Sequence, residues 1–77
     1  MLSEYDIYLY AASCGWIATI EFLHAGEYIR GVFLSRGAKT SLLGPLRAIQ
    51  QMTAEQFFTY LEWWEGAHGW NETERPR

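Results

Sequence analysis

Apolar and polar side chains alternate along residues 16–35, and this pattern constrains the fold more than any other stretch of the chain. Successive side chains of a strand point to opposite faces of a sheet. In the first half of the stretch, one face carries Trp16, Ala18, Ile20 and Phe22, and the other carries Ile17, Thr19, Glu21 and Leu23. Ala25-Gly26 supplies a turn, because glycine adopts positive φ without steric cost. The stretch therefore predicts a β-hairpin.

The two charged residues inside this hairpin indicate its register. A tight turn at residues 25–26 places Glu21 opposite Arg30 and Ile20 opposite Gly31. Apolar side chains then meet on one face and the two charges meet on the other. An exposed pair of this kind contributes about 0.2–1 kcal/mol, so it reports the register more than it stabilises the sheet. A slip of one residue would move every side chain of the second strand to the opposite face.

A third strand is expected before the hairpin. Residues 4–12 alternate between Ile7, Leu9, Ala11 and an opposite set that includes Tyr8 and Tyr10. A short loop at Cys14-Gly15 would pair this segment antiparallel with residues 16–22. The result is a three-stranded antiparallel β-meander.

Two helices are expected after the hairpin, following a polar connection at residues 36–40. The first runs from Leu42 to about Met52 with Ser41 as N-cap, since proline is tolerated in a first helical turn. The second runs over residues 54–67, because Thr53 and Gln56 have the spacing of a capping box. The predicted fold class is α+β, in the order βββαα.

Length and charge limit the remaining possibilities. The 77 residues predict one domain over residues 1–70, followed by a mobile charged tail at residues 71–77. The net charge of −3 disfavours broad nucleic-acid binding, which needs clustered Lys and Arg. Cys14 is the only cysteine, so no internal disulfide can form, and no Cys/His set has zinc spacing. We expect a cytoplasmic protein without a membrane span or a signal peptide.

The second face of the predicted sheet is the candidate binding surface. If both helices cover the first face, this one is unusually apolar for a free monomer, and exposed Tyr with Arg is typical of interaction surfaces. The residues expected to contact a protein partner are Tyr8, Tyr10, Glu21, Tyr28, Arg30 and Val32. On this interpretation, Tyr10→Glu or Val32→Glu abolishes association and leaves the fold intact. Helices covering both faces would remove this surface.

Short motifs resemble the N-terminal half of ribonuclease H. Residues 7–14, IYLYAASC, followed by Gly15-Trp16, are similar to that family's first strand and its entry into the second, and residues 46–49, LRAI, to its first helix. The resemblance implies a ribonuclease-H-like fold fragment. Aligned on these motifs, two catalytic carboxylate positions of the family fall at Ala11 and Gly44, so the resemblance implies no two-metal nuclease chemistry.

These observations favour a non-enzymatic protein-binding module, with no catalytic residue, no metal and no cofactor. Its size and mild acidity are similar to those of small phage inhibitors of host defence, such as anti-CRISPR proteins, which act in the host cytoplasm. A homodimer is a second form of association. The alternative is a degenerate ribonuclease-H-like module that contacts nucleic acid or a nucleoprotein through Arg36, Lys39 and Arg47, together with Arg30. An enzyme would require a titratable residue in a pocket with a charged partner.

Overall fold

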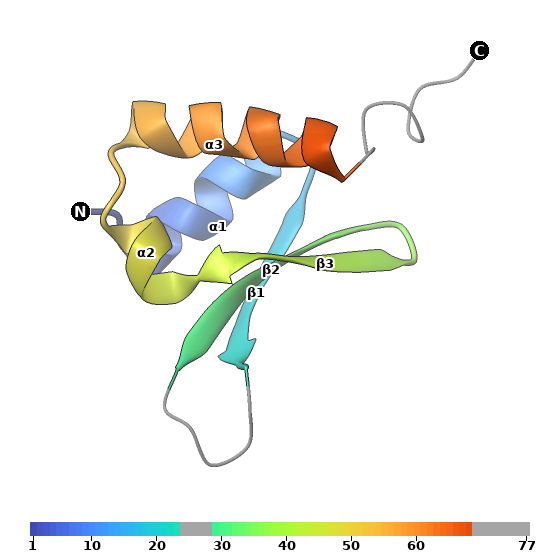
Figure 1. Ribbon diagram of the computed structural model, residues 1–77, viewed down its shortest axis with the longest axis horizontal. Coiled ribbons are helices and arrows are strands. Elements are labelled where there is room, and N and C mark those ends of the chain that lie inside the picture. The colour runs from blue at the N-terminus through green and yellow to red at the C-terminus, as the bar shows by residue number, and fades with distance from the viewer. Residues whose placement is uncertain (24–28, 69–77) are drawn as a thin grey trace.

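The computed structural model describes residues 1–23 and 29–68 (Figure 1). The elements in chain order are α1 (Glu4–Ser13), β1 (Ile17–Phe22), β2 (Arg30–Arg36), β3 (Lys39–Pro45), α2 (Leu46–Gln50) and α3 (Ala54–Ala67). The strands form one antiparallel sheet in the order β1-β2-β3, and two helices follow it. The predicted α+β class with a three-stranded antiparallel meander before two helices is confirmed. A further helix precedes the sheet. The predicted tail at residues 71–77 lies outside the described residues.

The expectation of a strand at residues 4–12 is wrong, because this segment is helix α1. Ser3 begins the helix with a capping box, in which its Oγ accepts from the Asp6 backbone N–H at 3.0 Å and Asp6 Oδ2 accepts from the Ser3 N–H at 3.0 Å. Ile7 and Ala11 lie one helical turn apart and are both fully buried, whereas Leu9 is half exposed. The apolar residues of this segment fit a period of two and a helical turn equally well, and the cap favours the helix.

The third strand is β3, which occupies a segment expected to be a polar connection and the start of a helix. Gly37, with φ of +64°, forms the turn that brings Lys39 opposite Arg36. Ser35 and Thr40 then share a hydrogen bond of 2.8 Å between their hydroxyl groups across the strands. Because residues 39–45 extend along β2, the helix predicted over residues 42–52 is reduced to α2, Leu46–Gln50.

The β1–β2 hairpin is confirmed, but its register differs by one residue from the prediction. Ile20 pairs with Val32 and Glu21 with Gly31, in place of the predicted partners Gly31 and Arg30. The shift turns the even-numbered residues of β2 toward the helices, and Val32 is 0% exposed. Val32 is therefore a core residue and cannot contact a partner.

Helix α3 closes one face and one edge of the sheet. Thr53 and Gln56 form the predicted capping box, with hydrogen bonds of 3.0 and 3.1 Å, which confirms this helix start. Tyr60 Oη donates to the Leu43 carbonyl at 2.7 Å, and Trp64 Nε1 donates to the Leu42 carbonyl at 3.0 Å. Two backbone carbonyls of edge strand β3 therefore already accept hydrogen bonds from side chains of α3. This limits the pairing of β3 with a further strand.

The apolar core lies between the sheet and the helices (Figure 1). Its fully buried large side chains come from the three helices, from the inward-facing positions of β2 and from the residue that precedes β1: Ile7, Trp16, Val32, Leu34, Ile49, Phe57, Leu61 and Trp64. Within residues 1–23 and 29–68, no helix is both long enough and apolar enough to span a membrane.

Val32→Glu is expected to unfold the protein. A carboxylate buried without a partner costs several kcal/mol, a large fraction of the about 5–15 kcal/mol that stabilises a typical domain. The matched variant Ile17→Glu places the same group on the exposed face of β1, where the effect should stay within about 1 kcal/mol. Far-UV circular dichroism and urea titration measure both variants, and equal unfolding midpoints would contradict the observed register.

Candidate partner-binding surface

The side of the sheet that faces away from the helices carries an apolar surface, which we call the outer sheet face. Its apolar side chains come from odd-numbered positions of β1 and β2, from one position of β3 and from the residue that follows β1: Ile17, Leu23, Phe33 and Leu42. Thr19 and the exposed Glu21 lie on the same side of β1. Thr19, Phe33 and Leu42 form one cross-strand row. Ile17 is 69% exposed and Leu42 is 41% exposed, so these side chains face solvent.

Gly31 lies near the middle of the outer sheet face and lets two leucines cover it. A Cβ atom at this position would lie 2.5 Å from Leu23 Cδ2 and 3.1 Å from Leu42 Cδ1. The two side chains therefore converge from the flanking strands into the space that a larger residue would occupy. The surface is continuous across all three strands as a result.

An open groove adjoins the end of the outer sheet face, with a volume of about 430 Å³. Its lining residues come from the start of β2 and from the β3–α2 junction: Ile29, Arg30, Pro45, Leu46, Arg47 and Gln50. We call it the arginine groove. Pro45 lies opposite Gly31 in the sheet, which joins the groove to the outer sheet face. A groove lined by apolar residues and two arginines is suited to a ligand that has both apolar and anionic parts.

The two arginines of the groove differ in their contacts. Arg30 forms an ion pair with Glu4 of α1, and both side chains are 41% exposed. Glu4 therefore takes the place that the sequence analysis assigned to Glu21, because the one-residue shift sets Glu21 opposite Gly31. Arg47 forms no ion pair or hydrogen bond with the rest of the described residues through its side chain, and it is exposed.

The residues predicted to contact a protein partner do not form one surface. Tyr8 and Tyr10 belong to α1 instead of the sheet, and Tyr10 packs on Phe58 with ring centroids 5.2 Å apart. Glu21 is exposed on the outer side of β1, whereas Val32 is buried. Arg30 lines the groove. Tyr28 lies outside the described residues. The helical α1 and the shifted register together separate the set.

The predicted nucleic-acid contacts divide between two ends of β2. Arg36 and Lys39 pair across the β2–β3 turn, whereas Arg47 lies with Arg30 at the groove. The strand between these positions is about 20 Å long at roughly 3.3 Å per residue. The four cations therefore do not make one continuous basic surface.

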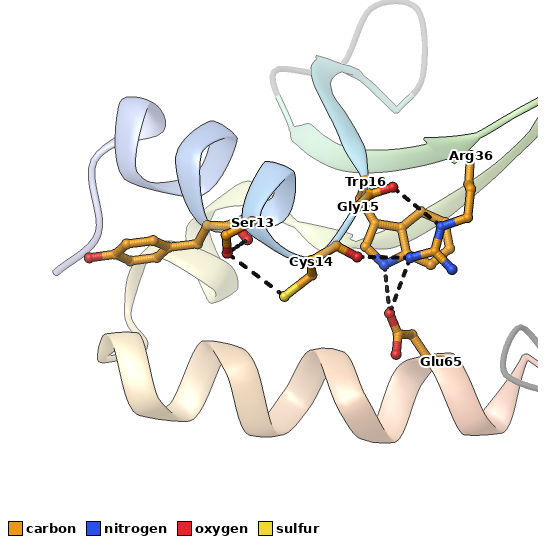
Figure 2. A network of polar contacts seen from close by, with 7 residues as sticks. Ser13, Cys14, Gly15, Trp16, Arg36 and Glu65 are labelled. Atoms are coloured by element: carbon orange, nitrogen blue, oxygen red, sulfur yellow. Dashed lines mark hydrogen bonds and ion pairs between the residues drawn. The ribbon is translucent and has the colours of Figure 1, made fainter.

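Arg36 of β2 belongs to a network that connects residues 14–16, between α1 and β1, with β2 and α3 (Figure 2). Its guanidinium lies 3.7 Å from the centre of the Trp16 ring. Its Nη2 donates to the Cys14 carbonyl at 2.9 Å, its Nε donates to the Gly15 carbonyl at 3.3 Å, and its Nη2 lies 3.7 Å from Glu65 Oε2. The same carboxylate oxygen accepts from Trp16 Nε1 at 2.6 Å.

This network is best explained as a structural connection. The Cys14 and Gly15 carbonyls follow the end of α1, where helical C=O groups lack intrahelical partners. Arg36 of β2 donates hydrogen bonds to both carbonyls. Glu65 links the arginine and Trp16 to α3. Trp16 also packs edge-on against Trp64 with centroids 5.3 Å apart. Arg36 is therefore partly enclosed and its Nε and Nη2 donors are occupied, which makes it a poor phosphate ligand.

Within the described residues, no group of three or more His, Cys, Asp or Glu side chains is placed to hold a metal ion. Compared with known proteins, the chain matches no family model, no curated protein and no solved structure at a significant level.

Sequence reasoning identified part of these surfaces. The alternation places Ile17 and Leu23 correctly on the face opposite the expected helices, and the nucleic-acid alternative names both arginines of the groove, together with Arg36 and Lys39. The predicted register, which sets Ile20 opposite Gly31, puts Phe33 on the opposite face, and Leu42 is predicted to begin a helix. Gly31 carried the missing signal, since a glycine in a strand interior marks a place where neighbouring side chains approach closely.

Replacing Arg36 with alanine is expected to destabilise the fold by about 1–3 kcal/mol, because partly buried carbonyls lose their donor and Trp16 loses its stacked cation. Urea unfolding measures this loss, and near-UV circular dichroism should report the altered tryptophan environment. Arg47→Ala is the matched control, since it removes the same side chain from an exposed site and should stay within about 0.5 kcal/mol. An equal loss in both variants would contradict the structural role of the network.

Proposed function

We propose that this chain is a small, non-enzymatic module that binds another protein through its outer sheet face and the adjoining arginine groove. The observation that carries the proposal is the difference in side-chain burial between the two sides of the sheet. The helices bury Ala18, Val32 and Leu34 on one side, while Ile17 and Leu42 on the other remain substantially exposed. Apolar side chains held side by side on a rigid sheet favour contact with a partner, since burial removes them from water.

The alternative of nucleic-acid binding has less support from the charge distribution. Contact with several successive phosphates requires Lys and Arg along one surface. Here Arg36 is held by the network around Trp16, and Arg47 lies at the opposite end of β2. The net charge of −3 opposes long-range attraction of a polyanion. A protein partner agrees better with a mainly apolar surface that carries cations at one end.

In this proposal the module acts by occupying a surface that its partner needs, without chemical change to the partner. Small phage inhibitors of host defence complexes, such as anti-CRISPR proteins, act in this manner in the host cytoplasm. The comparison with them rests on size and mild acidity. A second copy of the chain is a competing occupant of the same face, and solution mass distinguishes it.

Photo-crosslinking from the outer sheet face tests the proposal. A benzoylphenylalanine at position 17 or 42 should yield one shared protein adduct in native cells, because both positions project from the proposed binding surface. The same group at Glu62, which is exposed on α3, is the matched control and should not yield that adduct. Mass spectrometry identifies the adducts.

The purified partner should then bind the native chain and lose at least tenfold in affinity for Leu42→Asp, since a carboxylate would replace a buried apolar contact. Circular dichroism verifies that the variant folds. If the group at position 62 gave the same adduct in equal yield, the result would contradict the proposal. An adduct with twice the mass of the chain, together with a dimer in sedimentation, would show a homodimer in place of a foreign partner.

A further inference from the structure

We infer that the arginine groove selects an acidic residue of the partner, held between Arg30 and Arg47 and flanked by an apolar residue. This inference rests on the proposed protein-binding function and specifies the chemistry of the partner. Both arginines line one open pocket of about 430 Å³. None of its lining residues is acidic, and the carboxylate recorded against them is that of Glu4, which pairs with Arg30 and leaves Arg47 without an acidic partner among the described residues.

Arg30 can accept an incoming carboxylate at a cost of no more than about 1 kcal/mol. A guanidinium has five N–H donors, and the ion pair with Glu4 is recorded at Nη2 alone. Both partners of that pair are 41% exposed, and exposed ion pairs contribute about 0–1 kcal/mol. A carboxylate from a partner can therefore bind the remaining donors or displace Glu4. The existing pair also shows that the position of Arg30 is suited to a carboxylate.

Arg47 supplies the second cation from the first turn of α2. Its side chain is exposed and makes no ion pair with the described residues. Formation of a contact with a ligand therefore requires no existing pair to break. Hydrogen bonds between guanidinium and carboxylate groups are charge-assisted, and they strengthen further where a bound partner excludes water.

The remaining walls explain why the occupant is protein and not nucleic acid. Ile29, Pro45 and Leu46 provide apolar contact, and none of the residues that line the groove is aromatic, so no platform for base stacking is present there. Pro45 lies opposite Gly31 and connects the groove to the outer sheet face. A partner segment can thus place apolar side chains near Leu42 and a carboxylate between the arginines.

A short peptide provides a direct test. The probe is acetyl-Leu-Glu-Leu-Glu-amide, and the control is acetyl-Leu-Gln-Leu-Gln-amide, which has the same size and apolar content. Titration of the ¹⁵N-labelled chain should shift the amide signals of Ile29, Leu46 and Arg47. The dissociation constant for the glutamine peptide should be roughly tenfold higher or more, because the charge-assisted contacts are lost.

Three single variants identify which cations contribute to binding of the glutamate peptide. Arg30→Gln and Arg47→Gln should each weaken binding of the glutamate peptide about fivefold to tenfold. Lys39→Gln removes the same charge at the far end of β2 and should leave binding within about twofold, because screening limits charge effects beyond a Debye length of roughly 8–10 Å. The ¹⁵N spectrum of each variant verifies its fold.

Equal binding of the two peptides, or an equal loss for Lys39→Gln, would overturn the inference. A ten-nucleotide single strand that binds more tightly than the peptide, with Lys39→Gln and Arg47→Gln equally impaired, would overturn it in favour of nucleic acid. The failures of the two proposals are distinguishable. If crosslinking identifies a partner whose affinity is unchanged by Arg47→Gln, the selection of an acidic residue is wrong and the binding surface stands.

Discussion

The pairing of Ile20 with Val32 decides the character of both faces of the sheet. Because side chains alternate along a strand, this single pairing assigns Val32 and Leu34 to the core and Phe33 to the outer face. The opposite assignment would bury a glycine and expose two branched apolar residues. The hydrophobic effect therefore selects the observed register over the salt bridge between Glu21 and Arg30, since burial of one valine is worth about 1.5–3 kcal/mol and an exposed ion pair much less.

The rest of the fold secures the sheet against its helices by a few polar contacts at the boundary of the core. Trp16 contributes both apolar area and an N–H donor, and Glu65 accepts that donor while approaching Arg36. Tyr60 and Trp64, which also belong to α3, donate to carbonyls of β3. Aromatic side chains with a polar end are suited to this position, because they bury a large ring and still satisfy their donor. One edge of the sheet is thereby covered, while its outer face is not.

The outer sheet face and the arginine groove complement each other physically. The face offers dispersion and hydrophobic contact with little directional preference, whereas the groove offers directional hydrogen bonds to an anion. Together they provide the two components that protein interfaces combine, an apolar centre and a polar margin. The distribution of charge supports the same interpretation, because Arg30 and Arg47 share one pocket while Arg36 is enclosed by Trp16 and α3.

The sequence by itself determined the features that depend on local interactions. The capping box at Thr53 and Gln56 and the alternation of β1 identified α3, the hairpin and the exposed position of Ile17. The capping box of Ser3 and Asp6 is a further local signal, and it favours the helix at residues 4–12, whose apolar residues fit a strand and a helix equally well. The tertiary structure decided the register of the hairpin. It also decided the role of residues 39–45, which became a strand because β2 had an edge to pair. The groove belongs to this second group, because the ends of β2 and β3 meet Arg47 only after the sheet has formed, and no local pattern encodes such long-range contacts.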